Sequence, residues 1–170
     1  MIIRHERAGD GAAIEAVTIA AFTGHPYSDG SEPRIIRDLR RAGALALSLV
    51  CEEGSDIIGH VALSPVLIDG VDCGWFGLGP ISVLPDFQRA GIGSALMKAT
   101  IAWMQDRDAG GCVLVGDAAY YSHFGFAARE ALVLPDVPPV FFLALPLSDQ
   151  GRSGIVAFHP AFHGKGDGKA

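Results

Sequence analysis

The segment Gln88-Arg89-Ala90-Gly91-Ile92-Gly93 constrains the fold of this chain more than any other. It follows the apolar run Ile81-Ser82-Val83-Leu84 and precedes a segment that shows helical spacing of apolar residues from Ser94. Its glycines allow a tight turn with inward-pointing N–H groups, and a helix N-terminus behind it adds about half a positive charge. The order predicts a strand, an anion-binding loop and a helix, with a phosphate or pyrophosphate as the anion.

Composition limits the class of protein. The chain has 170 residues, 49% of them hydrophobic, with no break in composition, which predicts one domain over residues 1–163 and a disordered tail over 164–170. A net charge of -6, spread along the chain, argues against nucleic acid as a partner. The chain has no apolar run of membrane-span length, and its first six residues do not resemble a signal peptide. We therefore expect no membrane partner and a cytoplasmic location.

The three cysteines are Cys51, Cys73 and Cys112, which are far apart and form no C-x-x-C pair. An odd number of isolated cysteines is typical of reduced thiols buried as small apolar side chains. We therefore expect neither a disulfide nor a metal site.

The first half of the chain alternates between helical and extended patterns. Residues 2–6 predict an edge strand, and Asp10 is placed to cap a helix that ends at Phe22. A polar, turn-rich segment at 24–30 and a short helix up to 40–43 are predicted to form a mobile wall of a binding site.

Extended patterns dominate the middle of the chain. Residues 45–51 and 57–67 predict a hairpin, and Asp69-Gly70 predicts a second tight turn. Residues 75–83 continue the antiparallel series, but Gly77, Gly79 and Pro80 interrupt it, which predicts a bulge or bend.

The remaining elements follow the loop. We predict a helix from Ser94 to Gly110-Gly111, with Leu96, Ala99, Trp103 and Met104 on one face. A short buried strand at 112–115 comes next. Residues 132–134, 140–145 and 155–158 predict a last antiparallel section.

The order of strand, Gln-x-x-Gly-x-Gly loop, helix, short strand and Tyr120-Tyr121-Ser122-His123-Phe124-Gly125-Phe126 resembles the GCN5-related N-acetyltransferase (GNAT) superfamily. Within it, residues 79–85, 116–121 and 154–159 are similar to the YhbS-like branch of predicted N-acetyltransferases. The resemblance covers most of the chain. It implies an α+β fold with a mixed, mostly antiparallel sheet of six to seven strands, splayed at an acetyl-CoA site and flanked by about four helices.

The resemblance also implies the cosubstrate and its binding residues. The loop would hold the pyrophosphate of acetyl-CoA, the strand at 81–83 would pair with the pantetheine arm, and no metal would take part. The implied cofactor-binding residues are Ile81, Ser82, Val83, Gln88, Arg89, Ala90, Gly91, Ile92, Gly93, Ser94, Tyr121 and Phe124.

Tyr121 is the implied catalytic residue, because it stands four residues before Gly125-Phe126, as the family's tyrosine near the thioester sulfur does. It would protonate the departing thiolate. The alternative is a core aromatic whose hydroxyl meets a backbone carbonyl. The alternative role of Gln88 is to cap the loop, and that of Arg89 is a solvated side chain; Tyr120 is interpreted as packing.

One family feature is missing, since many members carry a glutamate base on the strand before the loop. Here residues 75–81 contain no carboxylate, so proton removal comes from elsewhere or the amine arrives neutral. The candidates are Glu32, Asp29, His25 and His60, each with an alternative role as a surface or satisfied core group. For Asp117 we prefer the role of N-cap of the helix that carries Tyr121.

These features predict an enzyme that transfers acetyl from acetyl-CoA to a primary amine of a small molecule or peptide, by direct attack through a tetrahedral intermediate. The alternative is a non-catalytic acyl-CoA-binding sensor or regulatory module. A dinucleotide site fails on spacing, because Leu96 occupies the position of the third glycine. Neither the acceptor nor the oligomeric state follows from the sequence.

Overall fold

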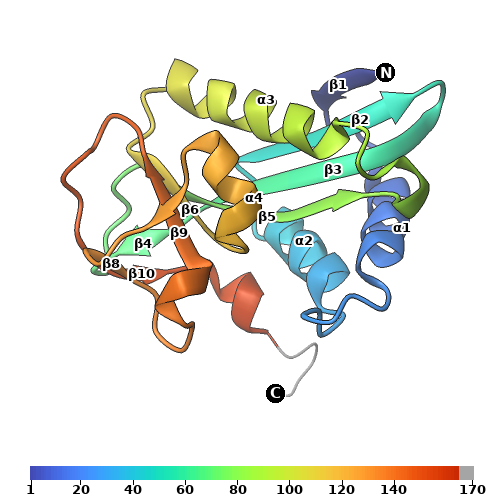
Figure 1. Cartoon of the computed structure of the whole chain (residues 1–170). Helices are drawn as coiled ribbons and strands as arrows, with labels where there is room; N and C mark the ends of the chain where they lie inside the picture. The colour runs from blue at the N-terminus through green and yellow to red at the C-terminus, as the bar shows by residue number, and fades with distance from the viewer. Residues whose placement is uncertain (165–170) are drawn as a thin grey trace.

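The fold is taken from a computed structural model that describes residues 1–164. The main sheet has seven strands in the order β1-β2-β3-β5-β6-β9-β7 (Figure 1), which confirms the predicted α+β class. These strands are β1 (Ile2–His5), β2 (Leu47–Glu53), β3 (Asp56–Pro65), β5 (Trp75–Val83), β6 (Gly111–Val115), β9 (Phe142–Pro146) and β7 (Ala127–Ala128). The predicted tail lies outside the described residues, apart from Gly164.

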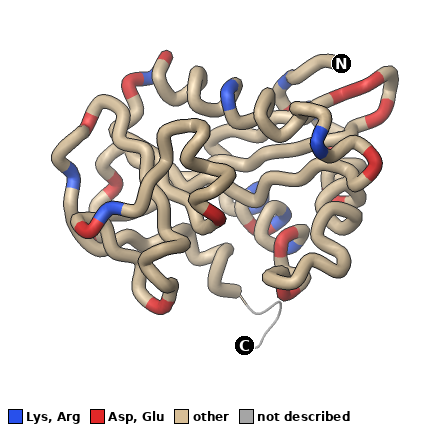
Figure 2. Tube along the Cα trace, viewed as in Figure 1, with Lys and Arg blue, Asp and Glu red and all other residues tan. Residues whose placement is uncertain are grey.

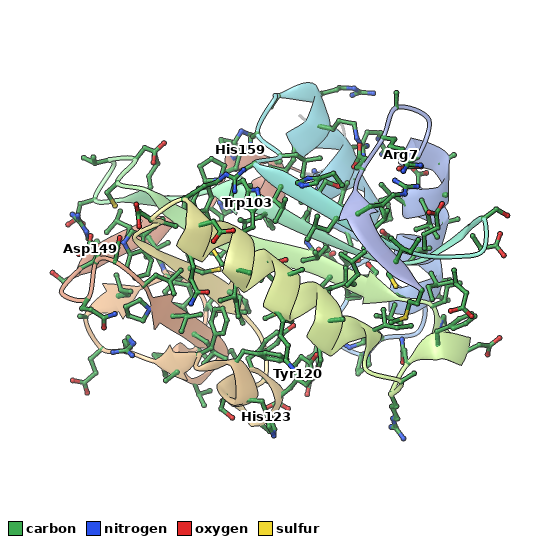
Figure 3. All side chains as sticks on the ribbon, turned by 90° about the horizontal axis from the view of Figure 1, so that it is seen from above. Arg7, Trp103, Tyr120, His123, Asp149 and His159 are labelled. Atoms are coloured by element: carbon green, nitrogen blue, oxygen red, sulfur yellow. The ribbon has the colours of Figure 1, made fainter. Side chains whose placement is uncertain are left out.

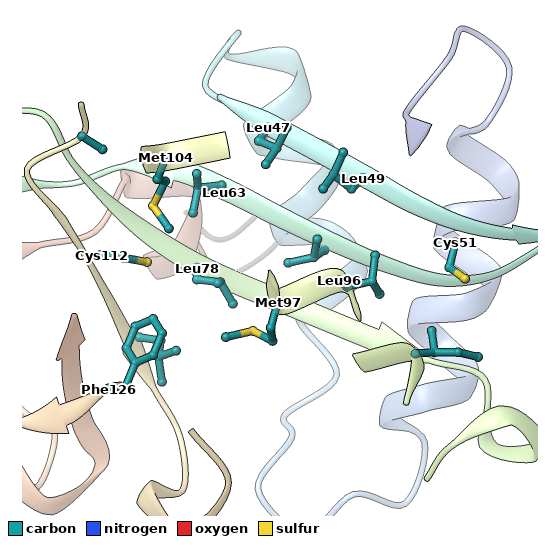
Figure 4. Close-up of a cluster of buried hydrophobic side chains, with 14 of the residues drawn as sticks. Leu47, Leu49, Cys51, Leu63, Leu78, Leu96, Met97, Met104, Cys112 and Phe126 are labelled. Atoms are coloured by element: carbon teal, nitrogen blue, oxygen red, sulfur yellow. The ribbon is translucent and has the colours of Figure 1, made fainter. Parts of the chain in front are cut away.

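Helices cover both faces of the main sheet (Figure 1). They are α1 (Gly11–Phe22), α2 (Glu32–Arg41), α3 (Ile92–Asp106) and α4 (Ala118–Tyr121). The α3 side is closed by an apolar cluster that includes Leu63, Leu78, Leu96 and Met97 (Figure 4). A second cluster, with Ile14, Val17 and Ile36, joins α1 and α2 to the opposite face.

Several short elements complete the chain. A second sheet has the order β4-β10-β8, with β4 (Leu67–Ile68), β10 (Gly154–Ala157) and β8 (Leu132–Val133). Four 3₁₀ turns are η1 (Pro85–Phe87), η2 (Ser122–Phe124), η3 (Pro139–Phe141) and η4 (Pro160–His163). The predicted hairpin is confirmed as β2–β3, and the Asp69-Gly70 turn has both residues at positive φ, 51° and 78°.

Three local predictions are wrong. Asp10 stands at the N-cap of α1 but makes no capping bond, because its carboxylate accepts hydrogen bonds from Arg4 and from the N–H of Arg7. The helix α3 begins at Ile92 rather than Ser94 and ends at Asp106. The predicted last antiparallel section is divided, because β9 joins the main sheet beside β6 whereas β10 pairs in parallel with β8.

The buried face of α3 also differs from the predicted one. It is formed by Ile92, Leu96, Met97, Thr100 and Met104. Ala99 and Trp103 are only half-buried, and the Trp103 ring lies 4.1 Å from the guanidinium carbon of Arg107. This is a cation–π contact at the edge of the buried face, while the ring also packs against Phe76.

Gly110 and Gly111 do not end a helix but make room for the ring of Trp75. A Cβ on Gly111 would lie 2.5 Å from Trp75 Cη2, and one on Gly110 would lie 2.6 Å from Nε1. The ring is fully buried. Only residues without a side chain fit here.

We therefore expect Gly111→Ala to lower the free energy of unfolding by about 1–3 kcal/mol, since an extra methyl in a packed core forces rearrangement. Gly151→Ala is the matched control, because no atom lies within 4 Å of its Cβ position. Urea unfolding of both variants measures the difference. An equal, small loss in both would contradict the packing argument.

The predicted bend in β5 is confirmed. Its pairing with β3 shifts register between Val61 and Leu63, opposite Gly79 and Pro80. Gly79 has φ +136°. Two residues of β5 therefore oppose one of β3, which is a β-bulge.

The three thiols are free, with Cys51 and Cys112 buried and Cys73 half-buried. Within residues 1–164, no helix is long and apolar enough to cross a membrane. The same residues contain no group of three His, Cys, Asp or Glu side chains that could hold a metal ion.

Candidate functional site

The main sheet opens between β5 and β6. The two strands pair in parallel only from Trp75 to Gly77 and from Gly111 to Val113. Residues 78–83 have no pairing to β6 in the described part of the chain, so one edge of β5 is unpaired there. We call residues 78–83 the open edge; it is the splay that the family resemblance implies.

Strand geometry decides which groups the open edge offers. The N–H of Leu84 donates to Ile58 O at 2.9 Å, so the main chain of Leu84, and of Ser82 two residues earlier, faces β3. Ile81 and Val83 therefore turn their N–H and C=O groups away from β3. The Gln88 side chain confirms this, because its Nε2 donates to Val83 O at 3.0 Å.

The predicted anion loop lies at the end of this edge. Within residues 1–164, no backbone N–H from residues 89 to 94 donates a hydrogen bond to the protein, and the first such bond in α3 runs from Ala95 N to Gly91 O. Arg89 and Gly91 have φ angles of 64° and 87°. Alternating left-handed residues turn successive N–H groups to one side, which makes an anion-binding concavity. The helix dipole of α3 adds positive potential there.

Tyr121 is positioned by a short, capped helix. Asp117 Oδ1 accepts a hydrogen bond from Ala119 N at 2.9 Å, which confirms the preferred N-cap interpretation. The Tyr121 ring lies directly against the backbone of Gly116, where no Cβ would fit. It meets the Phe126 ring edge-on at 6.2 Å.

The Tyr121 hydroxyl keeps its proton at neutral pH. Burial, assisted by the neighbouring Tyr120, raises its pKa to about 12. It has no hydrogen-bond partner among the described residues. The predicted alternative, a hydroxyl held by a backbone carbonyl, is therefore not seen.

Tyr120, which the sequence analysis interprets as packing, lies beside the predicted anion loop. Its hydroxyl lies 3.1 Å from the Cβ position of Gly93, over the first turn of α3. Its side chain is 41% exposed, and Figure 3 shows it beside the N-terminal half of α3. The predicted site residue Phe124 packs on it edge-on, at 5.4 Å between ring centres.

The candidate bases lie in different surroundings. His25 and Asp29 belong to the segment between α1 and α2, and Glu32 is the first residue of α2. Among residues 1–164, their side chains bond only to near neighbours, as Ser28 does to Glu32 at 2.8 Å. Hydrogen bonds from the hydroxyl and N–H of Ser31 lower the pKa of Asp29. His60 differs from these, since it is fully buried in β3.

Charge is dispersed around the site. Figure 2 shows Lys and Arg spread over several elements, among Asp and Glu, instead of collected on one face. The loop carries one basic side chain, Arg89, which is exposed. The backbone therefore supplies most of the positive potential for an anion.

Known proteins match this chain in sequence and in fold. The family description "Acetyltransferase (GNAT) domain" matches residues 45–128. The Escherichia coli protein named "Uncharacterized N-acetyltransferase YhbS" is 31% identical in an alignment of 157 positions, and the match covers 88% of this chain and 94% of that protein.

Two solved structures are similar over nearly the whole chain. A GNAT family acetyltransferase from Brucella melitensis, in complex with acetyl-CoA, is 45% identical with a TM-score of 0.86, covering 95% of this chain and 97% of that one. Escherichia coli YhbS in complex with CoA is 28% identical with a TM-score of 0.87, covering 96% and 92%. The chain therefore belongs to the GNAT family of N-acetyltransferases and is a relative of YhbS.

Proposed function

We propose that residues 1–163 form one domain that transfers acetyl from acetyl-CoA to a primary amine of a small molecule or peptide. The observation that carries the proposal is the row of unpaired N–H groups at residues 89–94, next to the open edge of β5. A pyrophosphate and a peptide-like arm are the two parts of CoA that such groups bind. The similar Brucella and Escherichia coli proteins bind acetyl-CoA and CoA.

The donor would lie along the open edge. Its pyrophosphate accepts hydrogen bonds from residues 89–94 and from the Tyr120 hydroxyl, and its pantetheine amides pair with Ile81 and Val83. Gln88 fixes the loop to the strand through Val83 O. The thioester then reaches the bulge at Gly79 and Pro80.

The chemistry needs three groups. The amine attacks the thioester carbonyl, and a backbone N–H near the bulge stabilises the oxyanion of the tetrahedral intermediate. When the intermediate collapses, the C–S bond breaks and the Tyr121 hydroxyl gives its proton to the thiolate. A hydroxyl with a pKa of about 12 is protonated at neutral pH and can serve as this acid. Three free thiols suit a cytoplasmic setting for the reaction.

The alternative is a sensor of acyl-CoA without turnover. It is favoured by the missing strand carboxylate, and the structure adds a reason for that absence. A Cβ on Gly77 would lie 2.6 Å from Phe158 Cε2 and 3.0 Å from Val66 Cγ1, so residue 77 has no space for a carboxylate side chain.

Release of CoA thiol in the presence of a panel of primary amines separates the two functions. We expect at least one amine to yield thiol and acetylated amine in equal amounts, with a rate that rises with pH as the amine loses its proton. Tight CoA binding without turnover on any amine would favour the sensor.

A further inference from the structure

A chain of polar side chains crosses the face of the main sheet that α1 and α2 cover. Arg40 donates to the Glu6 carboxylate at 2.8 and 3.0 Å. The Ser48 hydroxyl donates to Glu6 Oε1 at 2.5 Å and lies 2.8 Å from His60 Nε2. His60 stands directly opposite Ser82 in the pairing of β3 with β5. This row of polar side chains thus reaches from Arg40 on α2 to β5, the strand that borders the proposed donor site.

The hydrogen bonds determine the tautomer of His60. Ser48 has one hydroxyl proton, which it gives to Glu6, so its oxygen can only accept from His60. His60 Nε2 must therefore carry the proton, and Nδ1 has a free lone pair. A neutral histidine held in this way is a base with an oriented acceptor atom.

The free lone pair is buried without a partner. His60 Nδ1 and Ser82 Oγ both lack a hydrogen bond among the described residues, and the two side chains are 0% and 2% exposed. Unpaired buried polar atoms are costly, and opposed pairs of them commonly accommodate a water or a polar ligand group. Here the two unpaired atoms belong to His60 and Ser82, which are cross-strand neighbours, and Ser82 lies in the open edge of β5.

The end of this hydrogen-bonded row that lies away from β5 reaches solvent. Glu6, Ser48 and Arg40 line a cavity of about 580 Å³, together with exposed residues such as Arg7 and Gly43. Burial acts to raise the pKa of Glu6, but the hydrogen bonds from Arg40 and Ser48 outweigh it and keep the pKa below its usual value. Glu6 is therefore an ionised carboxylate at neutral pH.

We propose that His60 takes the proton of the acceptor amine, directly or through one water beside Ser82, and that Ser48 and Glu6 pass a proton on to this cavity. The inference rests on the proposed function and supplies its missing base. The acceptor ammonium loses its proton as H–Nδ1 forms, directly or through the water, and the electron pair of the broken N–H bond stays on nitrogen to attack the thioester carbonyl. The Nε2 proton moves to Ser48 Oγ, the Ser48 proton moves to the Glu6 carboxylate, and Glu6 releases it to water.

The charges around His60 suit a relay that does not store the proton. Burial lowers the pKa of His60 to about 4, the nearby Glu6 carboxylate raises it and Arg40 lowers it. The buried residues of α1, which are Ile14, Val17 and Thr18, are uncharged. His60 is thus neutral at pH 7 and able to accept a proton.

Ser48→Ala tests the relay, because it removes the hydroxyl that links His60 to Glu6 and leaves His60 in place. We expect kcat for the amine found by thiol release to fall about 10²-fold, the low end of what a positioned acid–base group contributes, with KM and CoA affinity unchanged. Ser48→Thr keeps the hydroxyl and should retain most of kcat. Ser64→Ala is the matched control, since Ser64 is a buried serine of β3 that makes no hydrogen bond to Glu6, Ser48 or His60. This variant should keep wild-type kcat.

The possible results distinguish failure of the relay from failure of the proposed acetyltransferase function. Wild-type turnover together with equal turnover of Ser48→Ala would overturn the relay alone, whereas no wild-type turnover on any amine would overturn both. Nitrogen-15 NMR of His60 gives a test that does not depend on activity. The relay predicts a protonated Nε2 at pH 7, and a protonated Nδ1 would overturn it.

Discussion

Replacement of Tyr121 by Phe is expected to lower kcat by about 10²–10⁴-fold and to change CoA affinity little, because a positioned acid acts only as the thiolate departs. The variant keeps the ring that packs on Gly116 and Phe126, so the fold should be preserved. Steady-state thiol release gives kcat, and calorimetric titration with CoA gives the dissociation constant.

Tyr120→Phe provides the contrast within the same helix. Its hydroxyl lies at the first turn of α3, so its loss should raise the dissociation constant of CoA by about two- to tenfold, the value of one hydrogen bond. Its kcat at saturating acetyl-CoA should fall far less than that of Tyr121→Phe. A Tyr121→Phe enzyme with wild-type kcat would show that another group protonates the thiolate.

Gly91→Val is expected to weaken CoA binding by about 5- to 150-fold, the equivalent of about 1–3 kcal/mol of backbone strain. Gly91 has φ +87°, which a β-branched residue strongly disfavours. Relief of that strain would turn the N–H groups of residues 89–94 away from the pyrophosphate.

Gly54→Val is the matched control for this strain. Gly54 also has a positive φ, 62°, with no atom within 4 Å of its Cβ position, and it lies in the turn between β2 and β3. Both variants should lose stability, but only Gly91→Val should lose CoA affinity in a titration. Equal affinities would indicate that the loop does not hold the anion.

The elements next to the site could be predicted because their signals are local. Gly79 and Pro80 predicted the bulge, and Gly91 with Gly93 predicted the turn into α3, since each depends on a few consecutive residues. The pairing of β8 with β10 could not be predicted in the same way. These strands have two and four residues, and their parallel register pairs Leu132 with Gly154, which are far apart in the sequence.

The same distinction applies to the site. Tyr121 could be named from its spacing to Gly125, but Tyr120 was interpreted as packing, because its place over Gly93 depends on how α4 folds back on α3. His60 was one of four candidate bases in the sequence. Its connection to Ser48 and Glu6 arises only from strand register, which no local pattern records.

The sequence showed that the strand carboxylate is absent, and the packing of Phe158 shows why. Phe158 comes from the end of β10, far along the chain, and its ring occupies the space beside Gly77. An acidic residue at position 77 would have to displace a buried aromatic ring. Position 77 therefore lies against an apolar wall that leaves no space for a carboxylate side chain.

A crystal structure of the chain with acetyl-CoA tests the central claim most directly. We predict pyrophosphate oxygens within hydrogen-bond distance of the N–H groups of residues 89–94, pantetheine paired with Ile81 and Val83, and the thioester sulfur next to the Tyr121 hydroxyl. A donor bound elsewhere, or a sulfur beyond reach of Tyr121, would contradict the assignment of this site.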